Sequence, residues 1–427
     1  MKKLVLFTLI FLFIFLKQVK AYVYLFVPDS NYDAISEVNI TDPSNPREIT
    51  RHRTVPSNLY GNPSRTAIDH YGNAWIGNRE TNTLIKVGNL GLGTCVDKNR
   101  NGVIDTSRDL NNNGNLDDDT IVDFEQDECI LMEVSLYYSQ RQYIGGENGV
   151  RAVCIDGSDN VYAGMYGLQK LFYVDGRTGN VLREIDLDCH PYGCIVDKNG
   201  IVWVSCVHDY KVVKYNPRDG SLNTYYQGVY VYGITPTPEG DGLVFNGWES
   251  SVVRKIGLNG DTIWSVEGWD QTPYQGRGIT VDKDGYIYAV GTYFGEVRKY
   301  DKNGNQLKGV RHICNSPYGI GLDYYDNVWV ACEGSIVRLD KELNVLNSLS
   351  FDGTHYVYSD WTGYLLKEIG PSITTCKICD VSVIPSNIEY YPIKFLCLFF
   401  NLFCNQIFSF LVLGLILFSL ILLKIMK

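Results

Sequence analysis

Positive charge, histidine and methionine are all scarce in this sequence. Its 427 residues hold 38 Lys and Arg against 48 Asp and Glu, a formal net charge of −10, with 6 His and 4 Met. This excess of acid argues against a nucleic-acid-binding surface, which needs clustered Lys and Arg. The chain also lacks G-x-S-x-G and H-E-x-x-H motifs, so it has neither a serine-hydrolase elbow nor the usual zinc-protease helix.

Long segments of helical periodicity are missing as well, whereas glycine and tyrosine are abundant. The chain holds 41 Gly and 31 Tyr. Its apolar runs are short, β-branched or aromatic, and bounded by Gly, Asp and Asn. Such runs favour strands that are joined by tight turns, so the sequence predicts an all-β protein.

Both ends of the chain carry targeting signals. Lys2 and Lys3 precede an apolar run and a small residue, Ala21, which predicts a signal peptide over residues 1–21; an uncleaved N-terminal anchor is the alternative. Ile407–Leu423 is 17 residues without a charge, within a hydrophobic tail over residues 395–424 that is long enough for a transmembrane helix. Lysines follow this tail, which favours a cytoplasmic C-terminus. We therefore expect an exported body over residues 22–370, a stalk over residues 371–394 and a single membrane anchor.

One pattern recurs within the body: a short apolar strand, an Asp-x-x-Gly-type turn and a second apolar strand. Its copies centre on Asp69, Asp156, Asp197, Thr237, Asp282 and Asp323, with a weaker copy at Asp360. From Asp156 to Asp323, successive copies are 41, 40, 45 and 41 residues apart. A period of about 40–45 residues, with about four strands in each unit, is typical of β-propeller blades.

The terminal units are incomplete. Tyr22–Ile40 matches the second and third strands of a blade, and Tyr356–Ile369 is a partial copy. Joined, they form a composite N-/C-terminal blade that closes the ring and removes exposed strand edges. Six internal units and one composite blade predict seven blades; six or eight are the alternatives.

The copies Arg277-Gly-Ile-Thr-Val-Asp282 and Tyr192-Gly-Cys-Ile-Val-Asp197 resemble NHL repeats and their relatives in the virginiamycin B lyase-like propellers. The resemblance covers about residues 22–370 and implies the propeller fold. It does not select an activity, because this repeat serves hydrolases, lyases and binding proteins alike. Lyases of this kind use a His-Glu-His arrangement with a divalent metal at the channel mouth. His190 is a candidate catalytic residue near this rim, with His355 also expected there, but the full set is not reproduced.

An acidic insertion, residues 90–129, separates the copies at Asp69 and Asp156. It holds two D-x-N-x-N-G-x-hydrophobic-D motifs, and the segment from Asp97 to Glu128 has 10 acids and 3 bases. Oxygen ligands at positions 1, 3, 5, 7 and 9 of such a loop suit calcium. The motif resembles the loops of EF-hands, dockerins and thrombospondin type 3 repeats, except that Arg108 and Thr120 replace the glutamate at position 12. A solvated acidic loop is the alternative. The predicted calcium ligands are Asp97, Asn99, Asn101, Val103, Asp105, Asp109, Asn111, Asn113, Asn115 and Asp117.

Export favours disulfides, so the 12 cysteines are interpreted as bridges first. Cys95 and Cys129 bracket the insertion. Two further predicted pairs, Cys189–Cys206 and Cys314–Cys332, flank Asp197 and Asp323 at equivalent positions. We expect Cys154 and Cys194 to be buried thiols, and Cys376 and Cys379 to form a local bridge in the stalk.

The residue about five positions before each repeat centre is expected at the channel mouth, at the start of an innermost strand. Arginine there offers a bidentate donor, and tyrosine offers stacking and a hydroxyl. This combination suits an anionic or sugar-like ligand; the alternative is that the side chains stack on each other and plug the channel. The predicted ligand-binding residues are Arg65, Arg151, Tyr192, Tyr232, Arg277, Tyr318 and Tyr356.

The sequence thus predicts a membrane-anchored, calcium-stabilised, extracytoplasmic module at the cell surface. We expect it to bind an extracellular ligand or protein rather than to catalyse a reaction. The alternative is an extracellular lyase or lactonase-like hydrolase with a metal-assisted site at the channel mouth.

Overall fold

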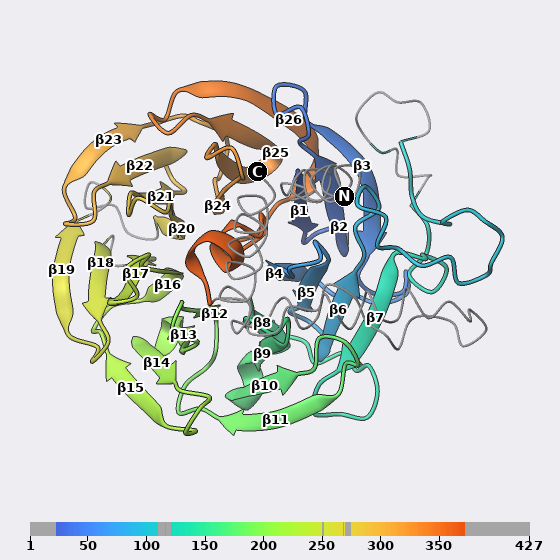
Figure 1. Ribbon diagram of the computed structural model, residues 1–427, viewed down its shortest axis with the longest axis horizontal. Coiled ribbons are helices and arrows are strands. Elements are labelled where there is room, and N and C mark those ends of the chain that lie inside the picture. Colours follow the sequence, from blue (N-terminus) through green and yellow to red (C-terminus); the bar gives the residue numbers. More distant parts are fainter. Residues whose placement is uncertain are drawn as a thin grey trace, which may run out of the picture. The chain divides into compact units, whose positions relative to one another are not determined.

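Seven antiparallel sheets surround a central channel in the computed structural model, which describes residues 23–109, 116, 121–249, 252–267, 269 and 275–371 (Figure 1). The predicted all-β propeller with seven blades is confirmed. Blade 1 comprises β1 (Tyr24–Asp29), β2 (Ala34–Asn39) and β3 (Arg47–Arg53); blade 2 β4 (Pro63–Ile68), β5 (Ala74–Asn78), β6 (Thr83–Val87) and β7 (Ile130–Ser135); blade 3 β8 (Val150–Ile155), β9 (Val161–Met165), β10 (Lys170–Val174) and β11 (Val181–Asp186). Blade 4 comprises β12 (Gly193–Val196), β13 (Val202–Cys206), β14 (Lys211–Tyr215) and β15 (Leu222–Tyr226); blade 5 β16 (Val231–Pro236), β17 (Gly242–Gly247), β18 (Val252–Gly257) and β19 (Thr262–Glu267). Blade 6 comprises β20 (Gly276–Val281), β21 (Ile287–Gly291), β22 (Glu296–Tyr300) and β23 (Gln306–Val310), and blade 7 β24 (Gly319–Leu322), β25 (Val328–Leu339) and β26 (Val345–Thr354).

Burial falls from the channel outwards. The inner strands β4, β8 and β16 are buried along their whole length, whereas the outer strand β11 is mostly exposed. Adjacent blades pack their sheet faces together, so the middle strands are covered on both sides; Trp75, Trp203 and Trp329 there are fully buried. This is why the apolar runs of the repeat are nearly continuous rather than alternating.

The repeated aspartate organises the turn between the first two strands of a blade. The Asp197 carboxylate accepts hydrogen bonds from the backbone N–H groups of Asn199 (2.8 Å) and Ile201 (3.0 Å), and from Trp203 Nε1 (2.9 Å). The same two backbone contacts recur at Asp69, Asp156, Asp282 and Asp323. A carboxylate that satisfies buried donors in this way fixes the tight turn.

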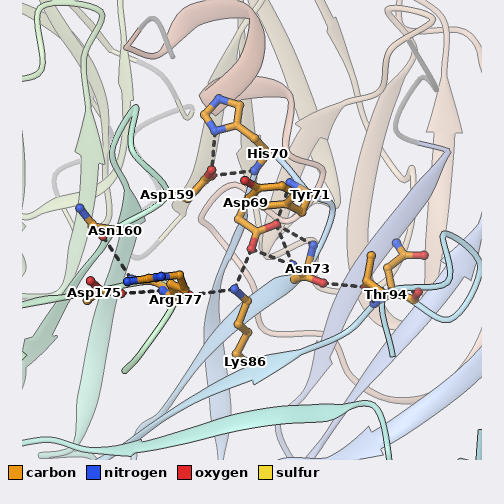
Figure 2. A network of polar contacts seen from close by, with 12 residues as sticks. Asp69, His70, Tyr71, Asn73, Lys86, Thr94, Asp159, Asn160, Asp175 and Arg177 are labelled. Carbon is orange, nitrogen blue, oxygen red and sulfur yellow. Dashed lines mark hydrogen bonds and ion pairs between the residues drawn. The ribbon is translucent and has the colours of Figure 1, made fainter. Parts of the chain in front are cut away.

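These turns also connect neighbouring blades. Figure 2 shows the Asp69 carboxylate of blade 2 facing Lys86 Nζ at 3.2 Å, while the same ammonium group donates to the carbonyl of Gly176 in blade 3 at 2.9 Å. His70 Nδ1 lies 2.8 Å from Asp159 of blade 3. Thr94, from the insertion, donates to Asn73 at 2.6 Å. The network therefore holds two blades and the insertion together.

The ring closes through the C-terminal segment, residues 354–371. Backbone hydrogen bonds join Phe26 N to Trp361 O (3.1 Å) and Ser30 N to Thr354 O (3.1 Å), so this segment lies along the inner side of β1. Thr354 ends β26, and the described residues after it form no strand, so the composite blade expected from the sequence has three regular strands and these backbone hydrogen bonds in place of a fourth. Beyond Trp361 the chain enters the channel, where Leu366 packs against the inner strands within the π-helical turn η4 (Leu365–Ile369) (Figure 1).

The insertion follows β6 and docks on blade 1. The Glu37 carboxylate of β2 accepts hydrogen bonds from Leu90 N (2.8 Å) and Gly91 N (3.1 Å). His52 Nδ1 of β3 lies 2.8 Å from an Asp127 carboxylate oxygen, and both side chains are fully buried. The insertion is thus attached to the first blade by polar groups that are removed from solvent.

Four disulfides are present in the described part of the chain. The predicted pairs Cys95–Cys129, Cys189–Cys206 and Cys314–Cys332 are confirmed. The expectation of free thiols at Cys154 and Cys194 is wrong, because these residues bridge β8 to β12 and so join the inner strands of blades 3 and 4.

The signal peptide (1–21), the stalk with Cys376 and Cys379, and the hydrophobic tail (395–424) lie outside the described residues. Within the described ranges, no helix has the length and apolar character needed to cross a membrane.

Candidate ligand-binding site at the channel mouth

The inner strands start at one end of the channel, and the predicted ligand-binding residues meet there. Arg65 lies in β4, Arg151 in β8, Tyr232 in β16 and Arg277 in β20, and Tyr192 directly precedes β12. Tyr356 comes from the C-terminal segment, and the ring of Tyr318 lies 5.1 Å from the ring of Tyr356. The fold therefore brings together seven side chains that are spread over nearly 300 residues of sequence.

Four tyrosine hydroxyls form a closed set of contacts, and we call these residues the four-tyrosine cluster: Tyr192, Tyr232, Tyr356 and Tyr358. The Tyr192 hydroxyl lies 3.1 Å from that of Tyr356 and 2.8 Å from that of Tyr358. The Tyr232 hydroxyl donates to Tyr358 at 2.8 Å and also contacts the Tyr356 hydroxyl. Each phenol oxygen therefore has two partners in the cluster.

Arginines stack on this cluster. The Arg65 guanidinium carbon lies 3.5 Å from the ring centroid of Tyr358 and 4.7 Å from that of Tyr192. Arg151 lies 4.3 Å from the Tyr192 centroid, and Arg277 lies 4.9 Å from the Tyr232 centroid. Cation–π attraction of this kind stabilises charge away from water. The most deeply buried of these side chains, above all Arg65, thus stack on their neighbours, as in the alternative in which the residues plug the channel.

Negative charge is sparse around these cations. Glu147 pairs with Arg151 at 2.7 Å and with Arg79 at 3.1 Å, and these arginines outweigh its burial and lower its pKa. Within the described residues, the buried atoms Nη2 of Arg65 and Nε of Arg151 have no hydrogen-bond partner. The mouth therefore combines buried positive charge with unused donors, which is an environment that favours an anion.

Tyr192 differs electrostatically from its three neighbours. Burial raises its pKa, but the charges of Arg151 and Arg65 and the neighbouring tyrosine hydroxyls outweigh that effect and lower the pKa to about 7. Burial dominates at Tyr232, Tyr356 and Tyr358, where the pKa is raised. Within the cluster, a negative charge is thus favoured at Tyr192.

Sequence reasoning missed a second set of residues around the mouth. Each member lies one or two residues after the second strand of its blade, ten or eleven positions after the repeat centre; this outer set is Arg79, Tyr166, His208 and Trp248. Arg277 stacks on Trp248, with the guanidinium carbon 5.3 Å from the ring centroid, and Arg79 stacks on Tyr356 at 4.6 Å. The constant offset was present in the repeat, so the sequence did contain a signal for this set.

Two other missed residues carry no such signal. Tyr358 lies in the incomplete copy around Asp360, two positions before its centre, where none of the other copies has a tyrosine. Glu147 lies in the glycine-rich run before β8, where it adopts a left-handed backbone conformation with φ of 58°.

His190, the candidate catalytic residue, lies at the outer edge of the mouth and is partly exposed. Its Nδ1 is 3.0 Å from Asp209, its Nε2 is 3.0 Å from Gln169, and its ring lies 4.9 Å from that of Tyr166. His355 is not at the rim: it is buried against Phe351, and burial lowers its pKa to about 4. The two histidines therefore do not form a joint site.

The first predicted calcium loop is compact. Asp97 accepts hydrogen bonds from the backbone of Asn101 (3.2 Å) and Gly102 (2.8 Å), and the amides of Asn99 and Asn101 reach Asp105 at 2.6 and 3.0 Å. Val103 donates its N–H to the Asn101 side chain, and Glu128 accepts from the backbone of Lys98, Asn99 and Asp105. In the second loop Asp109 is described, whereas Asn111, Asn113, Asn115 and Asp117 lie outside the described residues.

One further group has metal-binding residue types close together in the described residues, namely His52, Asp127 and Cys129. The sulfur of Cys129 is bonded to Cys95, and His52 faces Asp127 as a buried ion pair. This chemistry fits a structural role.

No protein-family model matches the chain, and no curated protein matches it. The chain does match solved structures. A streptogramin B lyase aligns with a TM-score of 0.53 and 12% identity over 74% of this chain and 92% of its own. A catalytically inactive virginiamycin B lyase from Staphylococcus aureus, solved with quinupristin, aligns with a TM-score of 0.50 and 16% identity over 68% and 84%. A functionally unknown protein from Desulfotomaculum acetoxidans gives 0.53 and 11% over 79% and 99%. These identities support a shared fold and no shared activity: the chain folds as a seven-bladed β-propeller that is structurally similar to the virginiamycin B lyase-like proteins.

Proposed function

We propose that this protein is a membrane-anchored, extracytoplasmic propeller that binds an anionic ligand at the arginine-rich end of its channel. The observation that carries the proposal is the pair of buried guanidinium atoms without a partner in the described residues, Nη2 of Arg65 and Nε of Arg151. A buried donor without an acceptor costs about 1–3 kcal/mol. The same two arginines carry buried positive charge, and an anion bound at the mouth would lower the cost of that charge without touching these atoms.

The parts of the mouth that a ligand can reach are the outer ones. Arg277, Tyr318 and Tyr356 are partly buried, and His208 is exposed. We infer that an anionic group lies over Arg277 while aromatic rings of the outer set, such as Trp248, contact the rest of the ligand. Buried Arg65 and Arg151 then act through their charge rather than through direct contact.

The export signal and the hydrophobic tail support the location, and the compact Asp97–Asp105 loop supports a calcium-stabilised insertion. Both remain parts of the proposal. The tail would hold the propeller at the membrane, with its ligand outside the cell.

The test is a calorimetric titration of the intact protein in detergent with sodium sulfate, and with glucose as a neutral comparison. We expect sulfate to bind, and Arg277→Gln to weaken binding at least about tenfold, equivalent to about 1.4 kcal/mol. Arg218→Gln, at an exposed turn, is the matched control and leaves binding unchanged. Binding of glucose but not of sulfate or other anions would contradict the proposal.

One observation favours the enzymatic alternative, a lyase or lactonase-like hydrolase. His190 is oriented by Asp209 at 3.0 Å, as a general base is oriented by a carboxylate. That alternative requires turnover of a lactone or ester that His190→Ala abolishes without weakening sulfate binding.

A further inference from the structure

We propose that Tyr192 is the internal counter-anion of the channel mouth: its phenol is deprotonated when no ligand is present and takes up a proton when an anion binds beside the arginines. The inference rests on the anion binding proposed above and adds a proton to that reaction. Ligand and phenolate thus compete for the same positive charge.

The first argument is the balance of charge. Two guanidinium groups flank the Tyr192 ring, at 4.7 Å for Arg65 and 4.3 Å for Arg151. Glu147 pairs with Arg151 and Arg79, but in the described residues no carboxylate forms an ion pair with Arg65, which is fully buried. A buried cation without a counter-ion is costly, and ionisation of an adjacent acid removes that cost.

The second argument is the position of Tyr192 in the four-tyrosine cluster. Its oxygen lies within hydrogen-bond distance of two hydroxyls, those of Tyr356 and Tyr358, and both can donate to it. A phenolate that accepts two hydrogen bonds is stabilised over the neutral phenol. Four neutral hydroxyls donating head to tail would also satisfy the contacts, so the flanking charges decide between the two states, and those charges favour the phenolate.

In the described residues, Tyr192 stacks with two guanidinium groups, and the carboxylate of Glu147 pairs with one of them, Arg151. Arg277 also interacts electrostatically with Tyr192. The groups that face Tyr192 from the neighbouring elements are Arg65 of β4, Glu147 and Arg151 at β8, Tyr166 of η2, His208 of η3, Tyr232 of β16 and Tyr356 and Tyr358 of the C-terminal segment. Arg151 and burial lower the pKa of His208, so this imidazole is neutral at physiological pH and adds no positive charge of its own. The cationic contribution comes from the arginines.

The reaction is balanced without any redox step. Tyr192 phenolate, a ligand anion and one proton from solvent give Tyr192 phenol and the bound anion. Above the pKa of Tyr192 the ligand must displace the phenolate charge, so its dissociation constant rises up to about tenfold for each pH unit. Below that pKa the affinity is independent of pH.

The experiment follows tyrosinate absorbance in the near ultraviolet while the intact protein in detergent is titrated from about pH 5.5 to 9. We expect one tyrosine to ionise with a midpoint near 7 and this step to be absent in Tyr192→Phe, which keeps the stacked ring. Tyr358→Phe removes one donor and shifts the midpoint upwards. Tyr293→Phe, at a ring that is 72% exposed, is the control and leaves the step unchanged.

Sulfate then tests the coupling. Saturating sulfate is expected to move the Tyr192 midpoint to higher pH, and calorimetry at pH about 8 in buffers of different ionisation enthalpy is expected to show uptake of a proton that Tyr192→Phe abolishes. Ionisation of all tyrosines only at high pH, or sulfate binding without proton uptake, overturns the inference while leaving the proposed function intact. A Tyr192 step at neutral pH without sulfate binding supports the internal counter-anion and overturns the proposed function instead.

Discussion

At the scale of single residues, the repeated aspartate does more than mark the blades. Asp197 and Asp323 each accept two backbone hydrogen bonds, and the second oxygen accepts from a fully buried tryptophan, Trp203 or Trp329. One carboxylate thus fixes a turn and orients the largest side chain of its blade. This geometry explains the pairing of an aspartate with a tryptophan six positions later in these two blades.

Asp197→Ala is expected to lower the free energy of unfolding by about 1–3 kcal/mol, because it leaves Trp203 Nε1 and two backbone N–H groups without an acceptor. Urea denaturation of the intact protein measures this change. Asp219→Ala, in an exposed turn, is the control and should stay within about 0.5 kcal/mol. Equal losses in both variants would contradict the role given to Asp197.

Some residues of the channel mouth could be predicted from the sequence, and others could not. The mouth residues were predictable because each blade repeats the same register, and a fixed offset from the aspartate places Arg65 or Tyr232 at a strand start. Tyr358 was not predictable, since it lies in an incomplete copy, at a position where the other copies have no tyrosine, and its place depends on the closure of the ring. The Cys154–Cys194 bridge joins strands of different sheets, so its pairing follows from blade adjacency rather than from spacing within one blade.

At the scale of elements, the insertion is a separate unit that is bound to blade 1 and braced by Glu128. The Glu128 carboxylate accepts three backbone hydrogen bonds from the first loop, at 2.7–3.0 Å, and it directly precedes Cys129 of the Cys95–Cys129 bridge. Glu128 therefore fixes the loop backbone, while the Asp97 and Asp105 carboxylates lie within the loop and accept hydrogen bonds from its own backbone and side-chain amides.

Calcium is expected to raise the melting temperature of the intact protein, since a ligand that binds the folded state alone stabilises it. Asp97→Ala, at position 1 of the loop, should remove most of this increase. Differential scanning calorimetry with calcium and with a chelator checks the prediction. Asp186→Ala, at an exposed strand end, serves as control; an unchanged response in Asp97→Ala would refute the site.

At the scale of the whole molecule, the junction between the two ends of the chain concentrates buried acids. Burial raises the pKa of Asp29 to about 8, of Glu37 to about 7 and of Asp360 to about 6. At a pH between its unfolded and its folded pKa, each of these groups is protonated in the folded protein but ionised in the unfolded chain. Asp29 and Asp360 lie at the ring closure, where they accept hydrogen bonds from Thr354 and Leu366, whereas Glu37 of β2 holds the insertion.

Stability is therefore expected to fall as the pH rises from about 4 to 8, between the unfolded and the folded pKa values of these groups. A group with a raised pKa stabilises the fold fully below its unfolded pKa, and this contribution is lost as the pH rises through the folded pKa. For Glu37 the shift from 4.5 to about 7 corresponds to a loss on the order of 3 kcal/mol. Melting temperatures across this range measure the effect.

Glu37→Gln keeps an acceptor for the insertion but no longer titrates, so its melting temperature should depend less on pH than that of the wild type. Glu267→Gln, on an exposed outer strand, should leave the pH dependence unchanged. A melting temperature that rises between pH about 4 and 8 would contradict the protonated state of these buried acids.

The path of the C-terminal segment has a mechanical consequence. Tension applied beyond residue 371 acts first on a chain that runs inside the channel, rather than on the free edge of a blade. The load reaches η4, then the Trp361–Phe26 hydrogen bond, and finally Tyr358 and Tyr356. Withdrawal of this segment would open the ring and would also remove the two phenol rings on which Arg65 and Arg79 stack. The mechanical resistance of the fold and the structure of the channel mouth therefore depend on the same few residues.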